Sequence, residues 1–470
     1  MVHRRPVLAL LGAWTRTGCA VSRRADRGRG PEHRDSSPRE SLVGATSEVD
    51  LVDIAHGGHA VGRVEGQVVF VRHGLPGERV LVTVTKGREG DRFVFADATE
   101  VLSASPHRVE SRCPVAGPGG CGGCDFQHVD LAHQRDLKAS VLRTQLSRLA
   151  KVDRDVQVHP VPGDEDGLRW RTRVEFAVDG AGRAGLRPQR SHDVIPLEDC
   201  PIATHGVVDT GVLQRDWSGM RAVDVVAPST GEPVVVPIPL EGEESGADPT
   251  SPEVDTADTA DATDADDTTG ALETERYVVE AVTGERWQGD FEVHARGFWQ
   301  VHPGAASTFV DRVLTVLDPQ PGERALDLYA GVGLFARALA DAVGEDGAVL
   351  AVESDARACA SLAAAATDLD QLEVRVGKVA DALIPLVEGG DEADLVVLDP
   401  PRVGAGRAVI TDVCALGPRA IAYVACDPAA LARDVAIAAE HGYELGEVTG
   451  YDAFPMTHHV EAIAVLRRAA

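Results

Sequence analysis

The spacing of apolar residues divides the chain into regions with different periods. Residues 47–103 contain five short segments that alternate apolar and polar positions or are rich in β-forming residues: Val49–Ile54, Gly62–Val64, Gln67–Val71, Arg79–Lys86 and Phe93–Leu102. A period of two is typical of half-buried strands, and short strands at regular spacing with glycine-rich turns indicate a barrel. We therefore predict a small OB-like β-barrel here, a fold often used on oligonucleotides.

The next region, residues 104–296, mixes two periods. Leu131–Ala150 repeats apolar residues every three to four positions and predicts a helix. Arg169–Phe176 alternates instead, which predicts a strand with Arg169, Arg171 and Arg173 on one face. Arginines beside an aromatic residue suit phosphate contact and base stacking, so we expect this strand to contact RNA; a solvated strand face would show the same pattern.

From about residue 297 to residue 470, short apolar runs alternate with helical stretches. The runs are Arg324–Tyr329, Ala348–Val352, Leu372–Val376, Ala393–Leu398 and Ala420–Ala425. Buried strands joined by helical crossovers predict an α/β fold with a doubly wound, mainly parallel sheet. Binding and catalytic groups of such sheets lie at the carboxyl ends of the strands, so the residues that follow each run are the candidates for a site.

Composition and charge exclude several classes of protein. The 470 residues include 46 Lys and Arg against 74 Asp and Glu, a formal net charge of −28. No apolar run is long enough to span a membrane, eight cysteines are too sparse for a disulfide scaffold, and the acidity argues against a non-specific nucleic-acid coat. Residues 241–275 hold 13 acidic residues and no Lys or Arg, which predicts a disordered acidic insert in the central region.

Residues 1–46 are rich in arginine and carry a short apolar stretch, Pro6–Trp14, behind Arg4 and Arg5. This stretch weakly resembles a secretory signal. It is short, however, and the thiol chemistry described below needs a reducing compartment. We therefore expect a disordered basic tail on a cytoplasmic protein, or a start codon assigned too early.

Polar residues follow three of the predicted strands. The segment Asp327–Phe335 leaves the first strand with two glycines, Glu353 ends the second, and Asp399-Pro400-Pro401 follows the fourth. Glycines at this point let a ligand approach the backbone, and an acid at the second strand can accept hydrogen bonds from ribose hydroxyls. These features fit NAD and S-adenosylmethionine equally. The Asp-Pro-Pro sequence resembles the motif that positions an aminated base in nucleic-acid methyltransferases, and it favours S-adenosylmethionine.

Two reactive groups stand beside the last predicted strands. Cys426 follows Ala420–Ala425 and precedes a helix, whose N-terminus would lower the pKa of the thiol. Glu461 enters an apolar strand, where a carboxylate is costly unless it has a partner or a function. A thiolate that adds to carbon 6 of uracil makes carbon 5 nucleophilic, and a base must later remove the carbon 5 proton. Cys426 and Glu461 are our candidates for these two roles.

On these motifs the chain resembles the RNA uracil-C5 methyltransferases with an N-terminal TRAM domain, above all the bacterial 23S rRNA branch. The resemblance covers about residues 47–240 and 276–470, and its motifs are Gly297–His302, Asp327–Phe335, Asp399–Arg402, Cys426–Pro428 with Arg433-Asp434, and Phe454–Glu461. It implies that Gln300, Tyr329, Glu353 and Asp399 hold S-adenosylmethionine, that Cys426 is the nucleophile and that Glu461 is the base. Leu334 and Asp427 stand where many members have Asn.

Four other cysteines, Cys113, Cys121, Cys124 and Cys200, include one CxxC pair in a Gly/Pro-rich loop. Zinc, a [4Fe–4S] cluster and four free thiols are all compatible with this spacing. The resemblance implies a [4Fe–4S] cluster, because rRNA members of the family carry one on matching cysteines. We expect such a cluster to join the loop to the central region rather than to act in redox chemistry.

We therefore expect a tail (1–46), a TRAM or OB-like barrel (47–103), a central RNA-binding α+β domain with the cluster and the acidic insert (104–296), and a methyltransferase domain (297–470). The expected reaction is S-adenosylmethionine-dependent methylation of carbon 5 of a uridine in RNA. The expected substrate is 23S rRNA, with tRNA as the alternative and no obligate protein partner. A non-catalytic RNA-binding iron–sulfur protein is the alternative from another class.

Overall fold

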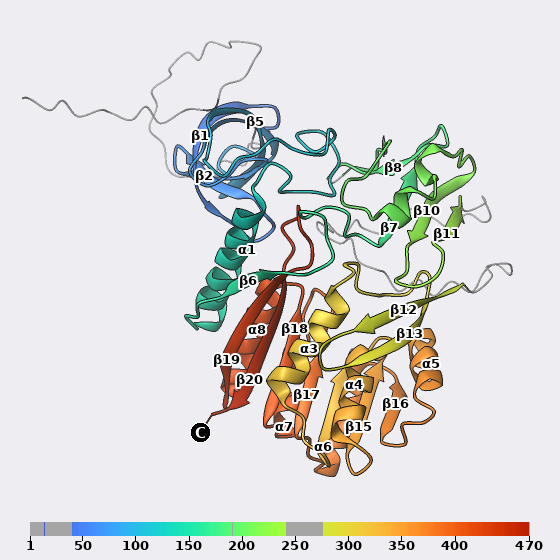
Figure 1. Cartoon of the computed structure of the whole chain (residues 1–470). Helices are drawn as coiled ribbons and strands as arrows, with labels where there is room; N and C mark the ends of the chain where they lie inside the picture. Colours follow the sequence, from blue (N-terminus) through green and yellow to red (C-terminus); the bar gives the residue numbers. More distant parts are fainter. Residues whose placement is uncertain (1–13, 15–39, 190, 241–275, 470) are drawn as a thin grey trace, which may run out of the picture. The chain divides into compact units, whose positions relative to one another are not determined.

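The computed structural model describes residues 14, 40–189, 191–240 and 276–469, which divide into two units (Figure 1). Unit 1 contains the described residues up to Gly120, together with Cys124–Val141 and Met456–His458. Unit 2 contains Cys121–Gly123, Leu142–Pro455 and His459 onward. The predicted acidic insert, 241–275, lies outside the described residues, as does most of the predicted tail.

A closed five-stranded barrel forms the larger part of unit 1. Its strands, in the order β1-β2-β3-β5-β4 around the barrel, are β1 (Thr46–Ile54), β2 (Ala60–Val64), β3 (Gln67–Arg72), β4 (Arg79–Lys86) and β5 (Phe93–Ser103). Every second residue of β4 is buried, namely Val80, Val82 and Val84, because alternate side chains point into the barrel. The predicted OB-like barrel is therefore confirmed, with each strand within a few residues of its expected bounds.

Helix α1 (Leu131–Gln145) follows the cysteine loop and begins after Asp130, whose carboxylate accepts a hydrogen bond from the His133 backbone N–H at 2.9 Å. It continues as one π-helical turn, η1 (Leu146–Ala150), which ends where Lys151 adopts a left-handed conformation. The predicted helix 131–150 is thus present, with a wider last turn. In unit 1, Leu137 of α1 packs with Ile54, Leu75, Phe126 and Val129.

The central part of unit 2 holds two small antiparallel sheets. Their strands lie in the orders β11-β10-β7-β8-β9 and β12-β13. The elements are β7 (Arg173–Val178), β8 (Ala184–Leu186), β9 (Ile195–Pro196), α2 (His205–Val208), η2 (Val212–Gln214), β10 (Met220–Val226), β11 (Val234–Pro239), β12 (Tyr277–Thr283) and β13 (Gln288–His294).

The strand predicted over Arg169–Phe176 begins only at Arg173, and its arginines do not form a free face. Arg169 has a positive φ of 55° and pairs with Asp199 at 2.7 Å. Arg173 is partly buried and pairs with the buried Glu280 at 2.8 Å. Both guanidiniums therefore have partners within the protein, and RNA contact by this segment remains a prediction.

The largest sheet has eight strands in the order β16-β15-β14-β17-β18-β20-β19-β6, of which the first five run parallel. They are β14 (Arg324–Leu328), β15 (Ala348–Glu353), β16 (Leu372–Val376), β17 (Leu395–Leu398), β18 (Ala420–Ala425), β19 (Tyr443–Asp452), β20 (Glu461–Arg468) and β6 (Gln157–Pro160). The predicted doubly wound α/β sheet is confirmed. β19 and β6 were not predicted.

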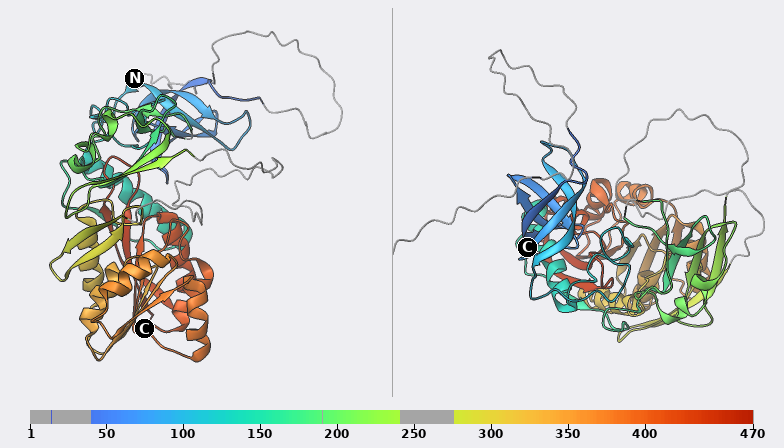
Figure 2. Two further views of the ribbon diagram at one scale, coloured as in Figure 1. Left: turned by 90° about the vertical axis from the view of Figure 1, so that its right-hand side faces the viewer. Right: turned by 90° about the horizontal axis from the view of Figure 1, so that it is seen from above.

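Helices pack on both faces of this sheet (Figure 2). One face packs on α3 (Ala305–Leu317), α4 (Leu334–Val343) and α5 (Ala356–Ala365), and the other on α6 (Val379–Gly389), α7 (Gly406–Ala415) and α8 (Pro428–Glu440). With both faces buried, the central strands β17 and β18 are apolar throughout. Among the described residues, no helix has the length and apolar character needed to cross a bilayer.

Candidate active site

The pairing of β18 with β20 brings the two predicted catalytic residues together. These strands are antiparallel, and Ala425 lies opposite Ala462. Cys426 follows Ala425 and Glu461 precedes Ala462, and the charge of Glu461 acts on the Cys426 thiol. Opposite residues of antiparallel strands project on the same side, with their Cβ atoms about 4.5–5.5 Å apart. The thiol and the carboxyl therefore emerge side by side at the carboxyl end of β18.

The Cys426 thiol is partly buried and electrostatically unlike the thiolate that we expected. Burial raises its pKa to about 12, and the charges of Glu461 and Asp399 act in the same direction. The charge of Arg402 acts in the opposite direction and lowers the thiol pKa. The helix α8 begins directly after Asp427, whose side chain accepts the Ala430 N–H at 2.7 Å. The expected lowering of the thiol pKa by this helix N-terminus was wrong, because desolvation and neighbouring carboxyls outweigh it.

Two carboxyl groups beside the thiol also have raised pKa values. Glu461 is 4% exposed, and burial together with the charge of Asp399 raises its pKa well above the ordinary value. Burial and the charge of Glu353 raise the pKa of Asp399 to about 7. A carboxyl with a raised pKa is a suitable general base near neutral pH, because it retains the proton that it removes.

The turn between β14 and α4 forms the floor of the predicted cofactor site. Gly331 and Gly333 have positive φ values, and a Cβ at Gly333 would lie 2.2 Å from Leu362, so only glycine fits there. A Cβ at Gly331 would meet no atom within 4 Å, which leaves the backbone open to a ligand. The Gly331 N–H donates to Oε2 of Glu353 at 2.9 Å, so this turn and the end of β15 are joined.

Asp327, which sequence reasoning did not single out, lies in β14 directly below this turn. It is 0% exposed, and burial raises its pKa to about 8, with smaller contributions from the charges of Asp399 and Glu353. Three carboxyl groups thus gather around an open glycine turn at the ends of β14, β15 and β17. An excess of carboxyls over cations fits a positively charged ligand, such as the sulfonium of S-adenosylmethionine.

Asp434 in α8 is a second residue whose role the sequence did not reveal, although it is part of the Arg433-Asp434 motif. Its Oδ2 accepts the Tyr423 hydroxyl at 2.6 Å and the Ala405 N–H at 2.8 Å. A Cβ at Gly404 would lie 2.8 Å from the same oxygen. Asp434 therefore holds the loop that follows Asp399 and carries Arg402.

Gln300 comes from a different element, the segment between β13 and α3. The Thr172 N–H and hydroxyl both donate to the Val301 carbonyl, at 2.9 and 3.0 Å. Arg173 donates to the carbonyls of Ala295 and Gly297 at 3.1 and 3.2 Å. Thr172 and Arg173, from the segment that we expected to contact RNA, therefore fix the backbone that carries Gln300.

The four predicted metal-ligating cysteines, Cys113, Cys121, Cys124 and Cys200, are all buried and form no disulfide. The Gly123 N–H donates to Sγ of Cys121 at 3.4 Å, and Nε2 of Gln127 donates to Sγ of Cys124 at 3.6 Å. Such donors suit thiolate ligands. Within the described part of the chain, however, no three His, Cys, Asp or Glu side chains are arranged to hold a metal ion. The geometry alone therefore identifies no metal site.

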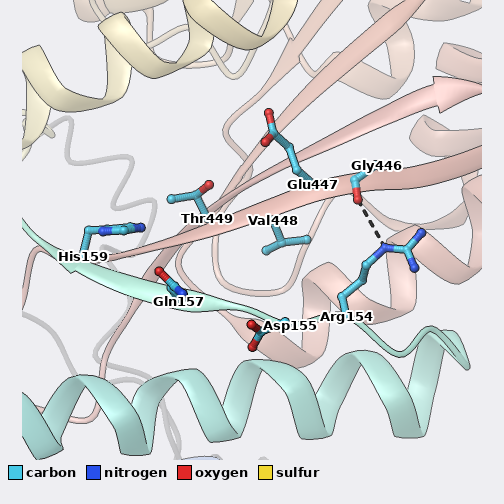
Figure 3. A pocket seen from close by; sticks show the side chains of 8 residues that line it. All are labelled: Arg154, Asp155, Gln157, His159, Gly446, Glu447, Val448 and Thr449. Carbon is cyan, nitrogen blue, oxygen red and sulfur yellow. Dashed lines mark hydrogen bonds between the residues drawn. The ribbon is translucent and has the colours of Figure 1, made fainter.

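A surface hollow of about 340 Å³ lies along the edge strand β6 and the neighbouring β19 (Figure 3). Its lining combines Arg154 and His159 with Asp155 and Glu447. Nε of Arg154 donates to the Gly446 carbonyl at 3.3 Å, at the bulge in β19. The hollow contains none of the predicted site residues, and its balanced charges favour no particular ligand.

Comparison with known proteins gives the family. Residues 40–99 match the TRAM domain, and residues 390–469 match the family described as tRNA (Uracil-5-)-methyltransferase. A protein of Streptomyces avermitilis named an uncharacterized RNA methyltransferase is 46% identical over 441 residues, which are 91% of this chain and 99% of that protein. The chain belongs to a family of RNA methyltransferases.

Further members agree with this assignment. A protein of Bifidobacterium longum, also named an uncharacterized RNA methyltransferase, is 34% identical over 452 residues, or 93% of this chain and 100% of that protein. Among solved structures, the Pyrococcus abyssi tRNA (uracil-54, C5)-methyltransferase in complex with S-adenosyl-L-homocysteine matches with a TM-score of 0.61 and 22% identity, over 89% of this chain and 100% of that one. The latter likeness concerns the fold. The predicted enzyme class, an S-adenosylmethionine-dependent RNA methyltransferase, is thus confirmed.

Proposed function

We propose that this enzyme methylates carbon 5 of a uridine in RNA through a covalent bond between Cys426 and carbon 6 of the base. The observation that carries the proposal is the pairing of Ala425 in β18 with Ala462 in β20, the residues directly next to Cys426 and Glu461, together with the effect of the Glu461 charge on the Cys426 thiol. Two such groups side by side can act in turn on adjacent carbons of one pyrimidine ring. Gln300, Tyr329, Glu353 and Asp399 would hold S-adenosylmethionine, which supplies the methyl group.

The protein contributes to two steps of the proposed reaction. The Cys426 thiol loses its proton to solvent, the resulting thiolate forms a bond to carbon 6, and the electron pair of the carbon 5–carbon 6 double bond moves to carbon 5, which becomes nucleophilic. After carbon 5 has been methylated, Glu461 takes its proton. The electrons of that carbon–hydrogen bond restore the double bond, and the bond from carbon 6 to sulfur breaks.

Because the pKa of the thiol is raised, the first step requires that Cys426 lose its proton. A thiol with a pKa near 12 is protonated at neutral pH, so the protein without ligands protects Cys426 from side reactions. Positive charge brought next to Asp399 and Glu353 would lower the thiol pKa by compensating the carboxylates. Arg402 already acts in this direction.

The proposed substrate is 23S rRNA, which rests on the resemblance of the four cysteines to those of the rRNA branch. The description of the family matched by residues 390–469 names tRNA instead, so tRNA is the second candidate. Incubating the enzyme with S-adenosylmethionine and either RNA, followed by nuclease digestion and mass spectrometry, distinguishes the two. We expect 5-methyluridine in 23S rRNA; product in tRNA alone would reverse the choice, and product in neither would refute the proposed activity.

A [4Fe–4S] cluster on Cys113, Cys121, Cys124 and Cys200 is a separate proposal, supported by the resemblance and by the burial of all four thiols. No catalytic step depends on it. Protein purified anaerobically should show broad visible absorbance and about four iron atoms per chain. A colourless protein that contains zinc, or no metal, would overturn this proposal and leave the proposed reaction standing.

A further inference from the structure

Three residues of the loop before the proposed base fold with unit 1, although the chain on both sides of them belongs to unit 2. These residues are Met456, Thr457 and His458. His459 and Val460 come next, and Glu461 is the first residue of β20. The backbone that leads to the proposed base is therefore held by groups of the unit that contains the barrel.

Backbone hydrogen bonds hold Met456 from two directions. Its carbonyl accepts the N–H groups of Asp125 and Phe126 at 3.0 and 2.9 Å, and its own N–H donates to Oε1 of Gln134 at 2.8 Å. Met456 also has a positive φ of 65°, which a residue with a side chain rarely adopts. Such a conformation persists only where the surroundings impose it.

Gln134 is well suited to this task. It is 0% exposed, and its amide nitrogen donates to the carbonyls of Phe126 and Val129 at 3.1 and 3.0 Å. The same nitrogen lies 3.3 Å from Sδ of Met456. One side chain of α1 thus fixes both the segment after the CxxC pair and the loop before the proposed base.

His458 is held on two further sides. Its Nδ1 lies 2.6 Å from Oδ2 of Asp125, and Oδ1 of Asp125 binds Arg72 of the barrel at 3.0 Å. On another side, the turn between β1 and β2 packs against it. A Cβ at Gly58 would lie 2.5 Å from Cβ of His458, so this turn can approach His458 only because residue 58 is glycine.

We infer that the barrel unit has a function in catalysis besides any contact with RNA: it positions Glu461 by fixing Met456 and His458. We call Gly58, Asp125, Phe126 and Gln134 the loop clamp. These are positioning residues, since none of them belongs to the proposed reacting groups. The inference rests on the proposed function, because it concerns the step in which Glu461 removes the carbon 5 proton.

The clamp predicts a particular kinetic defect. If Glu461 is displaced while Cys426 and the cofactor residues are intact, the sulfur still adds to carbon 6, but release of the product slows. The covalent enzyme–RNA adduct should then accumulate and be visible on a denaturing gel. A variant that only destabilises unit 1 would lower the amount of active enzyme without changing the fraction trapped as adduct.

The experiment compares Gln134→Leu and Gly58→Ala with Val82→Ala in the full-length enzyme. Val82 is buried in the barrel core and does not contact the loop, so its truncation reproduces a loss of stability alone. Glu461→Gln marks the adduct level when no base is present. We expect at least a threefold larger adduct fraction than in the wild type for both clamp variants, with methylation turnover reduced at least fivefold.

An adduct fraction in both clamp variants no larger than in Val82→Ala would overturn the inference, whatever their turnover. His458→Ala provides a further variant in case one clamp substitution prevents folding, and the same criterion applies to it. The absence of any adduct in Glu461→Gln would instead contradict the proposed reaction. The two failures are therefore distinguishable in one gel.

Discussion

Buried carboxyl groups around Glu78 and Asp125 in unit 1 differ in their pKa values from those at the carboxyl end of the large sheet. In unit 1, burial alone would raise the pKa of Glu78, but hydrogen bonds from Arg108 and from the Ser105 and Leu75 N–H groups lower it below the ordinary value. His458 and Arg72 likewise lower the pKa of Asp125 against the effect of burial. At the carboxyl end of the large sheet, Asp327, Asp399 and Glu461 all have raised pKa values.

The difference separates structural from functional polar groups. A buried carboxylate that is paired and hydrogen-bonded contributes to one fixed conformation, and removing its partner is costly. A cluster of carboxyls with raised pKa values costs stability, and it is tolerated where a ligand or a reaction uses it. By this criterion the end of the large sheet is the reactive region, while the polar groups of unit 1 hold segments in place.

The largest effect should come from the reactive region. Cys426→Ala removes the proposed nucleophile, and we expect methyl transfer to fall by at least about 10⁴-fold. Transfer of labelled methyl groups to RNA measures the loss. Cys414 provides the matched control, because it is also buried with a pKa raised to about 11 but lies in the apolar core of α7. Cys414→Ala should retain activity, and equal activity of the two variants would refute the nucleophile.

In unit 1, where the buried carboxylates are paired, we expect substitutions to lower stability rather than activity. Arg108→Ala leaves Glu78 without its guanidinium, and we expect a loss of about 3–5 kcal/mol in the free energy of unfolding the barrel. Hydrogen exchange of the β4 amides reports this loss. The exposed Arg79, which pairs with Glu48 at 2.6 Å, is the control and should change exchange little. Unchanged protection in Arg108→Ala would show that the buried pair does not stabilise unit 1.

The pH dependence of stability at Asp327 tests the difference between the two regions. Its pKa is about 8 in the folded protein against 3.8 in the unfolded chain, so the folded state binds the extra proton. The associated stability is present below about pH 4 and is lost as the pH rises through 8. Asp327→Asn should therefore raise the melting temperature of the ligand-free enzyme more at pH 8.5 than at pH 5.5.

A gain of 1 kcal/mol would raise that melting temperature by about 2–4 °C. The exposed Asp346 of the same sheet domain is the control, and Asp346→Asn should give the same difference at both pH values. If Asp327→Asn also shows no difference between the two pH values, Asp327 is not the group whose ionisation destabilises the folded protein.

The smallest effects concern the rate at which Cys426 reacts with iodoacetamide. Because its pKa lies near 12, the rate should rise about tenfold per pH unit between pH 7 and 9. Asp399→Asn removes a negative neighbour and should raise the rate at pH 8 a few-fold, whereas Arg402→Ala should lower it a few-fold. Peptide mass spectrometry measures both. Changes of the opposite sign would contradict the electrostatic description of the site.

Much of the fold could be predicted from the sequence because its periods are clear. β4 of the barrel alternates, and β17 and β18 are apolar throughout, so the positions of these strands and the residues at their ends follow directly. Cys426 and Glu461 could be proposed from chemistry alone. Their pairing could not, because it depends on which strands are neighbours: β20 inserts beside β18 in an antiparallel direction.

Other features depend on contacts between distant residues, which a single sequence does not display. The alternating arginines of the sequence place Arg173 on a predicted basic strand face. In the structure it binds Glu280, which lies 107 residues away in the sequence. The position of Cys426 before α8 suggested a lowered pKa, while the neighbouring carboxyls that raise it come from β17 and β20. Met456 joins unit 1 through a glutamine 322 residues earlier.

The most direct test of the central claim is to identify the atom of the protein that bonds to RNA. Glu461→Gln enzyme, incubated with S-adenosylmethionine and substrate RNA, should give a covalent complex that survives denaturation. Digestion and mass spectrometry should then find the peptide that contains Cys426 carrying a methylated uridine. A covalent bond to another cysteine, or no covalent complex under conditions in which the wild-type enzyme methylates the RNA, would contradict the account.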